Sequence, residues 1–169
     1  MTPRIVLIGP PGAGKSSIGR ALARALDIEF ADTDTLIEAD QGRSVSQIFV
    51  DDGELFFREV EERICLSALA NFNGVLALGG GAVLSAGVQE KLGEMDGEII
   101  FLDVSLAVAA PRVGFNRDRP LLLKNPRQQW QKMMDMRRPT YEALATTTIE
   151  VGDRSISKIV KEYMNRVGR

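Results

Sequence analysis

The residues best placed to do chemistry lie near the start of the chain, where positions 9–16 read Gly-Pro-Pro-Gly-Ala-Gly-Lys-Ser. This run fits the pattern G-x-x-x-x-G-K-[ST] and follows an apolar run at residues 5–8, so a strand, a loop and a helix should succeed one another here. In such a loop the glycines let backbone N–H groups turn toward a polyphosphate, and the helix start adds a positive end. Lys15 would reach the β and γ oxygens, and the Ser16 hydroxyl would ligate Mg²⁺. The alternative, a glycine-rich turn that merely joins a strand to a helix, does not explain the Gly-Lys-Ser ending.

Two aspartates follow the second predicted strand, which spans residues 28–31 and leads into Asp32-Thr33-Asp34. Ligands of an open parallel sheet bind at the carboxyl ends of its strands, so these aspartates should share an edge with the phosphate loop. Asp34 could accept the proton of an attacking hydroxyl, and Asp32 could hold a Mg²⁺-bound water. The alternative is that either aspartate simply caps the next helix.

Three consecutive glycines, Gly79-Gly80-Gly81, follow another apolar strand at residues 75–78. No acidic residue ends this strand, so Asp32 would have to supply the acidic metal position that phosphate-loop proteins use. The triplet offers bare N–H groups for the close approach of a ligand, and a flexible turn is the alternative.

Two arginines occupy positions on predicted helices. Arg58 has Glu61 three residues later, so an exposed helix ion pair is the alternative to a role in ligand binding. Arg137 stands close to Pro139, which should interrupt a helix over residues 128–145 and could aim the arginine inward. A solvated basic helix end is the alternative reading of Arg137.

A polar, arginine-rich stretch with two prolines spans residues 114–126 and is predicted to be a loop. Loops of this length in compact domains usually serve function, often as lids. An arginine that closes over a transferring phosphoryl group is a known device, and a charged surface loop is the alternative.

The composition narrows the chemistry. The chain has 169 residues, which suits one domain, and a net charge of −2, which gives no electrostatic case for a nucleic-acid partner. It contains no histidine and one cysteine, which excludes Ser-His-Asp catalysis, histidine-ligated metals and an internal disulfide. No stretch reaches membrane-spanning length, and the apolar run after Arg4 is too short for a signal peptide. We therefore expect a cytoplasmic enzyme that uses carboxylates, Lys, Arg, hydroxyls and Mg²⁺.

Strands and helices alternate along the chain, which predicts an α/β sandwich around a five-stranded parallel sheet. The expected strands are 4–8, 28–31, 75–78, 98–104 and 147–151. The expected helices are 17–26, 35–41, 44–50, 54–71, 85–92, 105–113, 128–145 and 155–167.

Taken together, these pieces resemble the shikimate kinase family over nearly the whole chain. The resemblance is carried by the loop at 9–16, Asp32-x-Asp34, Gly53-Glu54-x-x-Phe57-Arg58-x-x-Glu61, Gly79-Gly80-Gly81-Ala82, Arg119-Pro120-Leu121-Leu122 and Arg137-x-Pro139-x-Tyr141. The phosphate loop alone is common to many enzymes, whereas the ordered set is specific.

The resemblance implies a three-layer α/β sandwich with P-loop kinase topology, helices on both faces of the sheet and a mobile lid. It implies a single domain over residues 1–169, with substrate-binding helices at about 33–61 and the lid at about 114–126. The implied enzyme is a monomer that uses ATP and Mg²⁺ to phosphorylate the 3-hydroxyl of shikimate, a step toward chorismate and aromatic amino acids. Neither nucleic acid nor membrane is expected as a partner.

The resemblance also implies roles for individual residues. Lys15, Asp34 and Arg119 would be catalytic, with Asp34 orienting or deprotonating the 3-hydroxyl and Arg119 acting from the lid. Arg58 and Arg137 would clamp the shikimate carboxylate, while the three glycines shape the pocket. Ser16 and Asp32 would serve Mg²⁺. The nucleotide would be held by Gly12, Ala13, Gly14, Lys15, Ser16, Ser17, Arg112, Arg119 and Arg154.

This sequence departs from the family pattern in three places. Ser17 stands where Thr is common, Pro111 precedes Arg112, and Arg117 lies close enough to Arg119 to compete for the lid role. Two other functions stay open: a kinase for another small hydroxylated acid such as gluconate, or for a nucleotide, and a non-catalytic nucleotide-binding module. The intact Lys15 and Asp34 argue against the second.

Overall fold

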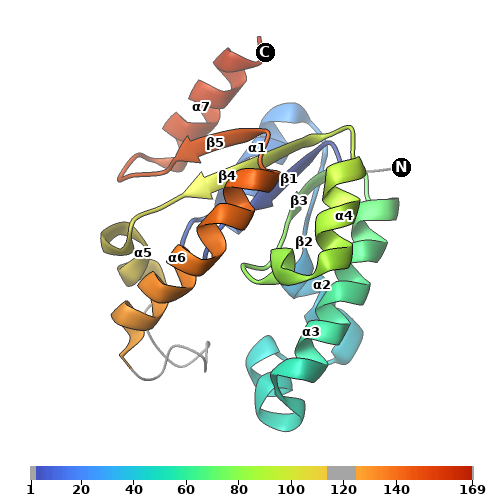
Figure 1. Ribbon diagram of the computed structural model, residues 1–169. Coiled ribbons are helices and arrows are strands. Elements are labelled where there is room, and N and C mark those ends of the chain that lie inside the picture. Colours follow the sequence, from blue (N-terminus) through green and yellow to red (C-terminus); the bar gives the residue numbers. More distant parts are fainter. Residues whose placement is uncertain (1–2, 114–124, 169) are drawn as a thin grey trace.

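A computed structural model describes residues 3–113 and 125–168 (Figure 1). The elements in chain order are β1 (Ile5–Ile8), α1 (Lys15–Leu26), β2 (Glu29–Asp32), α2 (Thr33–Gln41), α3 (Val45–Asn71), β3 (Gly74–Ala77), η1 (Ala82–Leu84), α4 (Ala86–Glu94), β4 (Glu98–Asp103), α5 (Leu106–Val113), α6 (Pro126–Leu144), β5 (Thr147–Glu150) and α7 (Ile156–Arg166). The predicted lid, with Arg117 and Arg119, lies almost wholly outside the described residues.

The described strands form one parallel sheet in the order β2-β3-β1-β4-β5. Helices α1 and α7 pack together on one face, and α3, α4 and α6 cover the other (Figure 1). The result is a three-layer sandwich, which confirms the predicted fold class. Because all strands run the same way, β1, β2 and β3 deliver their following loops to one edge, where the phosphate loop, the aspartates and the three glycines meet.

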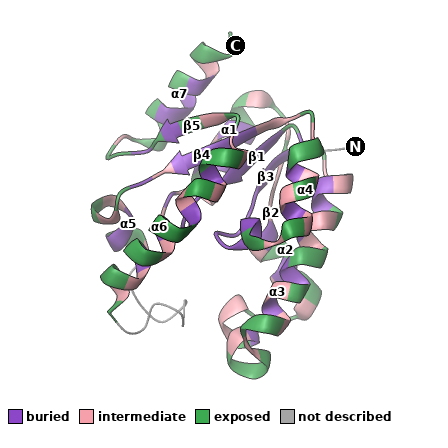
Figure 2. Cartoon of the chain, viewed as in Figure 1, coloured by how far each residue is buried: buried purple, intermediate pink, exposed green. Residues whose placement is uncertain are grey.

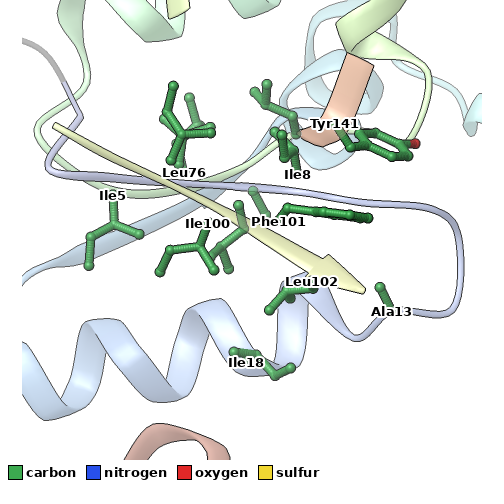
Figure 3. Close-up of a cluster of buried hydrophobic side chains, with 14 of the residues drawn as sticks. Ile5, Ile8, Ala13, Ile18, Leu76, Ile100, Phe101, Leu102 and Tyr141 are labelled. Carbon is green, nitrogen blue, oxygen red and sulfur yellow. The ribbon is translucent and has the colours of Figure 1, made fainter. Parts of the chain in front are cut away.

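The central strands are apolar because helices cover both of their faces. Every residue of β1 and β3 is buried, whereas the edge strands β2 and β5 are partly exposed (Figure 2). Figure 3 shows Ile8 and Tyr141 on one side of the sheet and Ile18 of α1 on the other. This packing holds the carboxyl edge of the sheet rigid beneath the loops that it carries.

The helix boundaries follow local signals in the sequence. Ser44 caps α3 by accepting a hydrogen bond from the Gln47 N–H at 3.0 Å, and Ser155 caps α7 in the same way. Gly53 interrupts α3 at φ 84° and ψ 175°, so the segment is two helices joined at a corner, as the sequence predicts. The part of α3 before the corner packs on α2, and the part after it carries Arg58 and Glu61 to the glycine turn that follows β3.

One prediction about α6 is wrong. Pro139 does not interrupt the helix, which runs continuously from Pro126 to Leu144. Proline removes only one helical hydrogen bond, and the side chains of α6 that pack on the sheet hold the helix through it; Trp130, Met134 and Tyr141 are all fully buried. Arg137 therefore faces inward from an unbroken helix, so a break at Pro139 is not what directs its side chain. Within the described residues, no helix is both long and apolar enough to cross a membrane.

Candidate active site

The phosphate loop owes its shape to glycines in the left-handed region, with φ 86° at Gly12 and 87° at Gly14. Gly12 is also required for lack of space, because a Cβ at this position would lie 2.9 Å from the Cβ of Ala109. Gly14 is the N-cap of α1, and Lys15 is the first residue of that helix. The Lys15 ammonium donates hydrogen bonds to the carbonyls of Gly9 at 2.8 Å and Pro10 at 2.9 Å. Lysine therefore lies folded over its own loop, as a cation that a polyphosphate could engage.

A cleft of about 410 Å³ opens beside this loop. It is lined by Pro11, Gly12, Gly14, Lys15, Ser16, Ser17, Ile18, Asp32, Asp34, Leu78, Gly79, Gly80, Arg112, Val151, Arg154, Ile156 and Ile159. All the predicted nucleotide-binding residues within the described segments are therefore brought together except Ala13, which is fully buried and donates its N–H to the Pro10 carbonyl at 3.3 Å. Arg112 reaches the Gly12 carbonyl at 3.3 Å, and Arg154 is held by Glu162 and the Glu150 carbonyl.

Asp32 caps the next helix, which was one of its two predicted functions, and it also contacts the hydroxyl that is predicted to ligate Mg²⁺. Its Oδ1 accepts the Asp34 N–H at 2.8 Å and so caps α2, while its Oδ2 accepts a hydrogen bond from the Ser16 hydroxyl. A hydroxyl and a carboxylate in contact at the mouth of a phosphate loop suit Mg²⁺, which prefers oxygen ligands and usually takes few from protein. The described residues contain no group of three or more His, Cys, Asp or Glu side chains that could hold a metal ion.

The glycine turn after β3 is closely surrounded by charged side chains. A Cβ on Gly79 would lie 2.8 Å from Oδ1 of Asp34 and 3.1 Å from Oε2 of Glu61. At Gly81, the added atom would be 2.3 Å from Nη1 of Arg58. At Gly80, it would be 3.5 Å from Nη1 of Arg137. At Gly79 two carboxylates, and at Gly81 the Arg58 guanidinium, stand where a side chain would begin, whereas the Arg137 guanidinium lies at ordinary contact distance from Gly80.

Arg58 and Glu61 form a pair that is not an exposed helix ion pair. Nη1 of Arg58 lies 2.8 Å from Oε1 of Glu61, whose side chain is only 4% exposed. Burial raises the pKa of the Glu61 carboxyl above its ordinary value, and the positive charge of Arg58 opposes that rise. Arg137 is buried, at 8% exposure, while the Arg58 side chain is 25% exposed, so the pocket holds one buried and one partly buried arginine. Paired cations in such a place are suited to a planar carboxylate ligand.

Four residues that the sequence analysis did not assign to the site support it. Thr33 accepts the Gly79 N–H at 2.9 Å, Tyr141 donates to the Gly80 carbonyl at 2.6 Å, and the Trp130 indole N–H donates to the Pro11 carbonyl at 3.0 Å. Glu61 fixes Arg58. The spacing of Glu61 and Arg58 and the place of Tyr141 in the Arg137-x-Pro139-x-Tyr141 pattern were available signals, whereas the contacts of Thr33 and Trp130 depend on the fold.

A family model, full-length relatives and a solved structure all relate this chain to shikimate kinases. The family model described as shikimate kinase matches residues 11–168. The chain is 44% identical to a shikimate kinase of Rhodococcus erythropolis over 99% of this chain and 98% of that one, and 42% identical to one of Mycobacterium marinum over 99% and 90%. The structure of the Acinetobacter baumannii shikimate kinase in complex with shikimate aligns with a TM-score of 0.91 at 32% identity, covering 99% of this chain and 93% of that one.

A gluconokinase from Sinorhizobium meliloti also aligns, with a TM-score of 0.56 at 22% identity over 99% of this chain and 93% of that one, which shows a shared fold alone. The parallel sheet with a phosphate loop, a neighbouring carboxylate and a basic pocket defines a P-loop kinase for a small acidic acceptor. Within that class, the chain belongs to the shikimate kinase family, as the match over nearly its full length shows.

Proposed function

We propose that the chain transfers the γ-phosphoryl group of ATP to the 3-hydroxyl of shikimate, giving shikimate 3-phosphate and ADP, and that the residues assembled at the carboxyl edge of the sheet do this work. The observation that carries the residue assignment is the meeting of Asp34, Arg58 and Arg137 around one glycine turn beside the phosphate loop. These residues come from α2, α3 and α6, so their convergence is a property of the fold.

Arg58 and Arg137 bind the shikimate carboxylate. Both guanidinium groups lie against the glycine turn, and the surrounding burial strengthens a charge-assisted contact with an anion. Glu61 holds Arg58 from the side, which leaves part of its guanidinium fork for the ligand. The pocket holds two cations, Arg58 and the buried Arg137, against one neighbouring carboxylate that pairs with Arg58, so an acidic acceptor is favoured over a neutral one.

Asp34 acts on the acceptor hydroxyl. It lies in the first turn of α2 and lines the cleft together with Lys15 and Ser16, between the basic pocket and the phosphate loop. The 3-oxygen of shikimate attacks the γ-phosphorus, the bond to the β–γ bridging oxygen breaks, and the hydroxyl proton passes to Asp34. Lys15 and the loop N–H groups neutralise charge on the phosphates, so positioning and electrostatics supply most of the rate enhancement.

Ser16 and Asp32 would hold Mg²⁺, which when bound screens the charge of the β and γ phosphates. Arg112 and Arg154 line the same cleft and would flank the adenine. Arg119 would approach the transferring group from the predicted lid. Arg119 lies outside the described residues, so its role stays a prediction.

A coupled ADP-release assay with shikimate, gluconate and a nucleoside monophosphate tests the acceptor. We expect Mg²⁺-dependent ADP release with shikimate alone. Equal turnover of gluconate, or no turnover with any acceptor, would contradict the proposal. The enzyme is further proposed to work as a monomer, as the resemblance to the shikimate kinase family implies, and in the cytoplasm, which its single cysteine supports. Light scattering coupled to size-exclusion chromatography would measure the oligomeric state.

A further inference from the structure

The neighbour of Arg137 on α6 makes an unusually well-defined contact outside the site. Arg138 donates from Nη1 to Oδ2 and from Nη2 to Oδ1 of Asp103, both at 2.9 Å. Two parallel bonds between a guanidinium and a carboxylate fix orientation as well as distance. The Arg138 guanidinium carbon also lies 5.8 Å from the centre of the Phe101 ring, and Nη1 reaches Glu142 at 3.4 Å. We call the contact between Arg138 and Asp103 the α6–β4 fork.

The fork connects two elements that matter for the site. Asp103 is the last residue of β4, and β4 pairs directly with β1, the strand that leads into the phosphate loop. Successive residues on a helix point about 100° apart, so Arg137 can face the glycine turn while Arg138 faces β4. The fork therefore sets the rotation of α6 one residue away from the side chain that faces the glycine turn.

The fork is placed where α6 is weakest. Pro139 has no N–H and cannot donate to the carbonyl of Asp135, so one helical hydrogen bond is missing in the turn that contains both arginines. Helices commonly kink at such a position, yet α6 continues through it. On the far side of the proline, Tyr141 stacks on Phe101 with ring centroids 5.1 Å apart and donates to the Gly80 carbonyl.

We propose that Arg138 is a positioning residue: through Asp103 it holds the proline-weakened turn of α6 against β4 and thereby directs Arg137 at the acceptor carboxylate. This deepens the proposed function and rests on the role given there to Arg137. The pair is partly exposed, with side-chain exposures of 37% and 22%. It should therefore contribute little to global stability, which separates a positioning role from a merely structural one.

The test compares R138M, D103N and the double variant with the parent enzyme. Methionine keeps an unbranched apolar stem over Phe101 but removes the fork. We expect the shikimate KM to rise about tenfold through misdirection of a binding group, with kcat, the ATP KM and the melting temperature little changed. The double variant should be no worse than the poorer single variant, and R138K, which keeps the charge but not the planar fork, should fall between parent and R138M.

Two further variants sharpen the test. R63M removes another arginine fork, from Arg63 to Asp40 between α3 and α2, and should leave the shikimate KM within about twofold because it touches neither α6 nor β4. P139A restores the missing helical N–H, so R138M/P139A should recover most of the shikimate KM lost in R138M. A rise that P139A does not reduce would overturn the role given to the proline.

Failure of the inference can be told apart from failure of the proposed function. If R137A raises the shikimate KM strongly but R138M does not, Arg138 has no positioning role and the proposed function stands. If R137A leaves the shikimate KM unchanged, the carboxylate role of Arg137 fails and the inference fails with it. A fall in melting temperature without any change in KM would show the fork to be structural only.

Discussion

The phosphate loop and the basic pocket around the glycine turn lie at the same edge of the sheet but are built in opposite ways. The loop is made from consecutive residues, and its ligand-facing groups are backbone N–H groups plus Lys15, which hydrogen-bonds to its own loop. The pocket is made from charged side chains of α2, α3 and α6 that meet over three glycines. The loop is therefore shaped by its own backbone, whereas the pocket is shaped by side chains that the glycines leave room for.

The difference explains why each region depends on its glycines. Gly12 and Gly14 are needed because their φ angles are positive. Gly81 has an ordinary φ of −97°, and it is needed because Arg58 occupies the place of its side chain. A change in the loop should therefore act through backbone strain on the nucleotide, and a change in the turn through displaced side chains on the acceptor.

The largest expected effect comes from a residue that belongs to neither region. Arg119→Ala should lower kcat by about 10³–10⁵-fold while both substrates still bind, because an arginine on the transferring group acts mainly in the transition state. A residue that precedes proline favours extended backbone angles, so the sequence predicts that Arg119, rather than Arg117, takes this role. Single-turnover kinetics on both alanine variants would decide, and the reverse ranking would transfer the role to Arg117.

Asp34 lies where the two regions meet, and its substitution should cause the next largest fall in kcat. Asp34→Asn keeps the size of the side chain but removes the proton acceptor, so kcat should fall by about 10²–10⁴-fold. The ATP KM should change little, because the loop is left intact. Steady-state kinetics with both substrates varied would measure this, and a kcat within about threefold of the parent would reduce Asp34 to a structural residue.

Paired glycine substitutions should separate the regions cleanly. Gly12→Ala introduces strain of about 1–3 kcal/mol at a positive φ and should weaken ATP binding. Gly81→Ala forces Arg58 aside at a similar overpacking cost of about 1–3 kcal/mol and should weaken shikimate binding instead. Isothermal titration with each ligand would show the two patterns, and equal losses for both ligands in both variants would refute the division.

The smallest effect concerns the buried carboxylate of the pocket. Because the pKa of Glu61 is raised in the fold, the folded state binds more protons than the unfolded state just above the ordinary carboxyl value of 4.5. Its contribution to the unfolding free energy therefore falls as pH rises through that window. The stability of the parent relative to Glu61→Gln should decline from pH 5 upward in urea titrations, and a pH-independent difference would show that Glu61 ionises normally.

The same contrast explains what could be predicted from the sequence. The phosphate loop and the cap at Ser44 were predictable because their residues are contiguous and act on their own backbone. Asp32 was ambiguous because its two oxygens serve two functions, one local and one with Ser16 across the sheet edge. The burial of Glu61 and the unbroken helix at Pro139 could not be predicted, because both depend on packing between elements distant in sequence. The roles given to single site residues remain predictions.

The contact between α6 and the phosphate loop has a practical consequence. Trp130 is the only tryptophan in the chain, it is fully buried, and its indole N–H donates to the carbonyl of Pro11 inside the loop. Indole emission responds to the hydrogen bond at its nitrogen, so a nucleotide that rearranges the loop should change the intrinsic fluorescence of the unmodified protein. Trp130 fluorescence can therefore report nucleotide binding without a label, because this residue lies where the phosphate loop contacts the helix that bears Arg137.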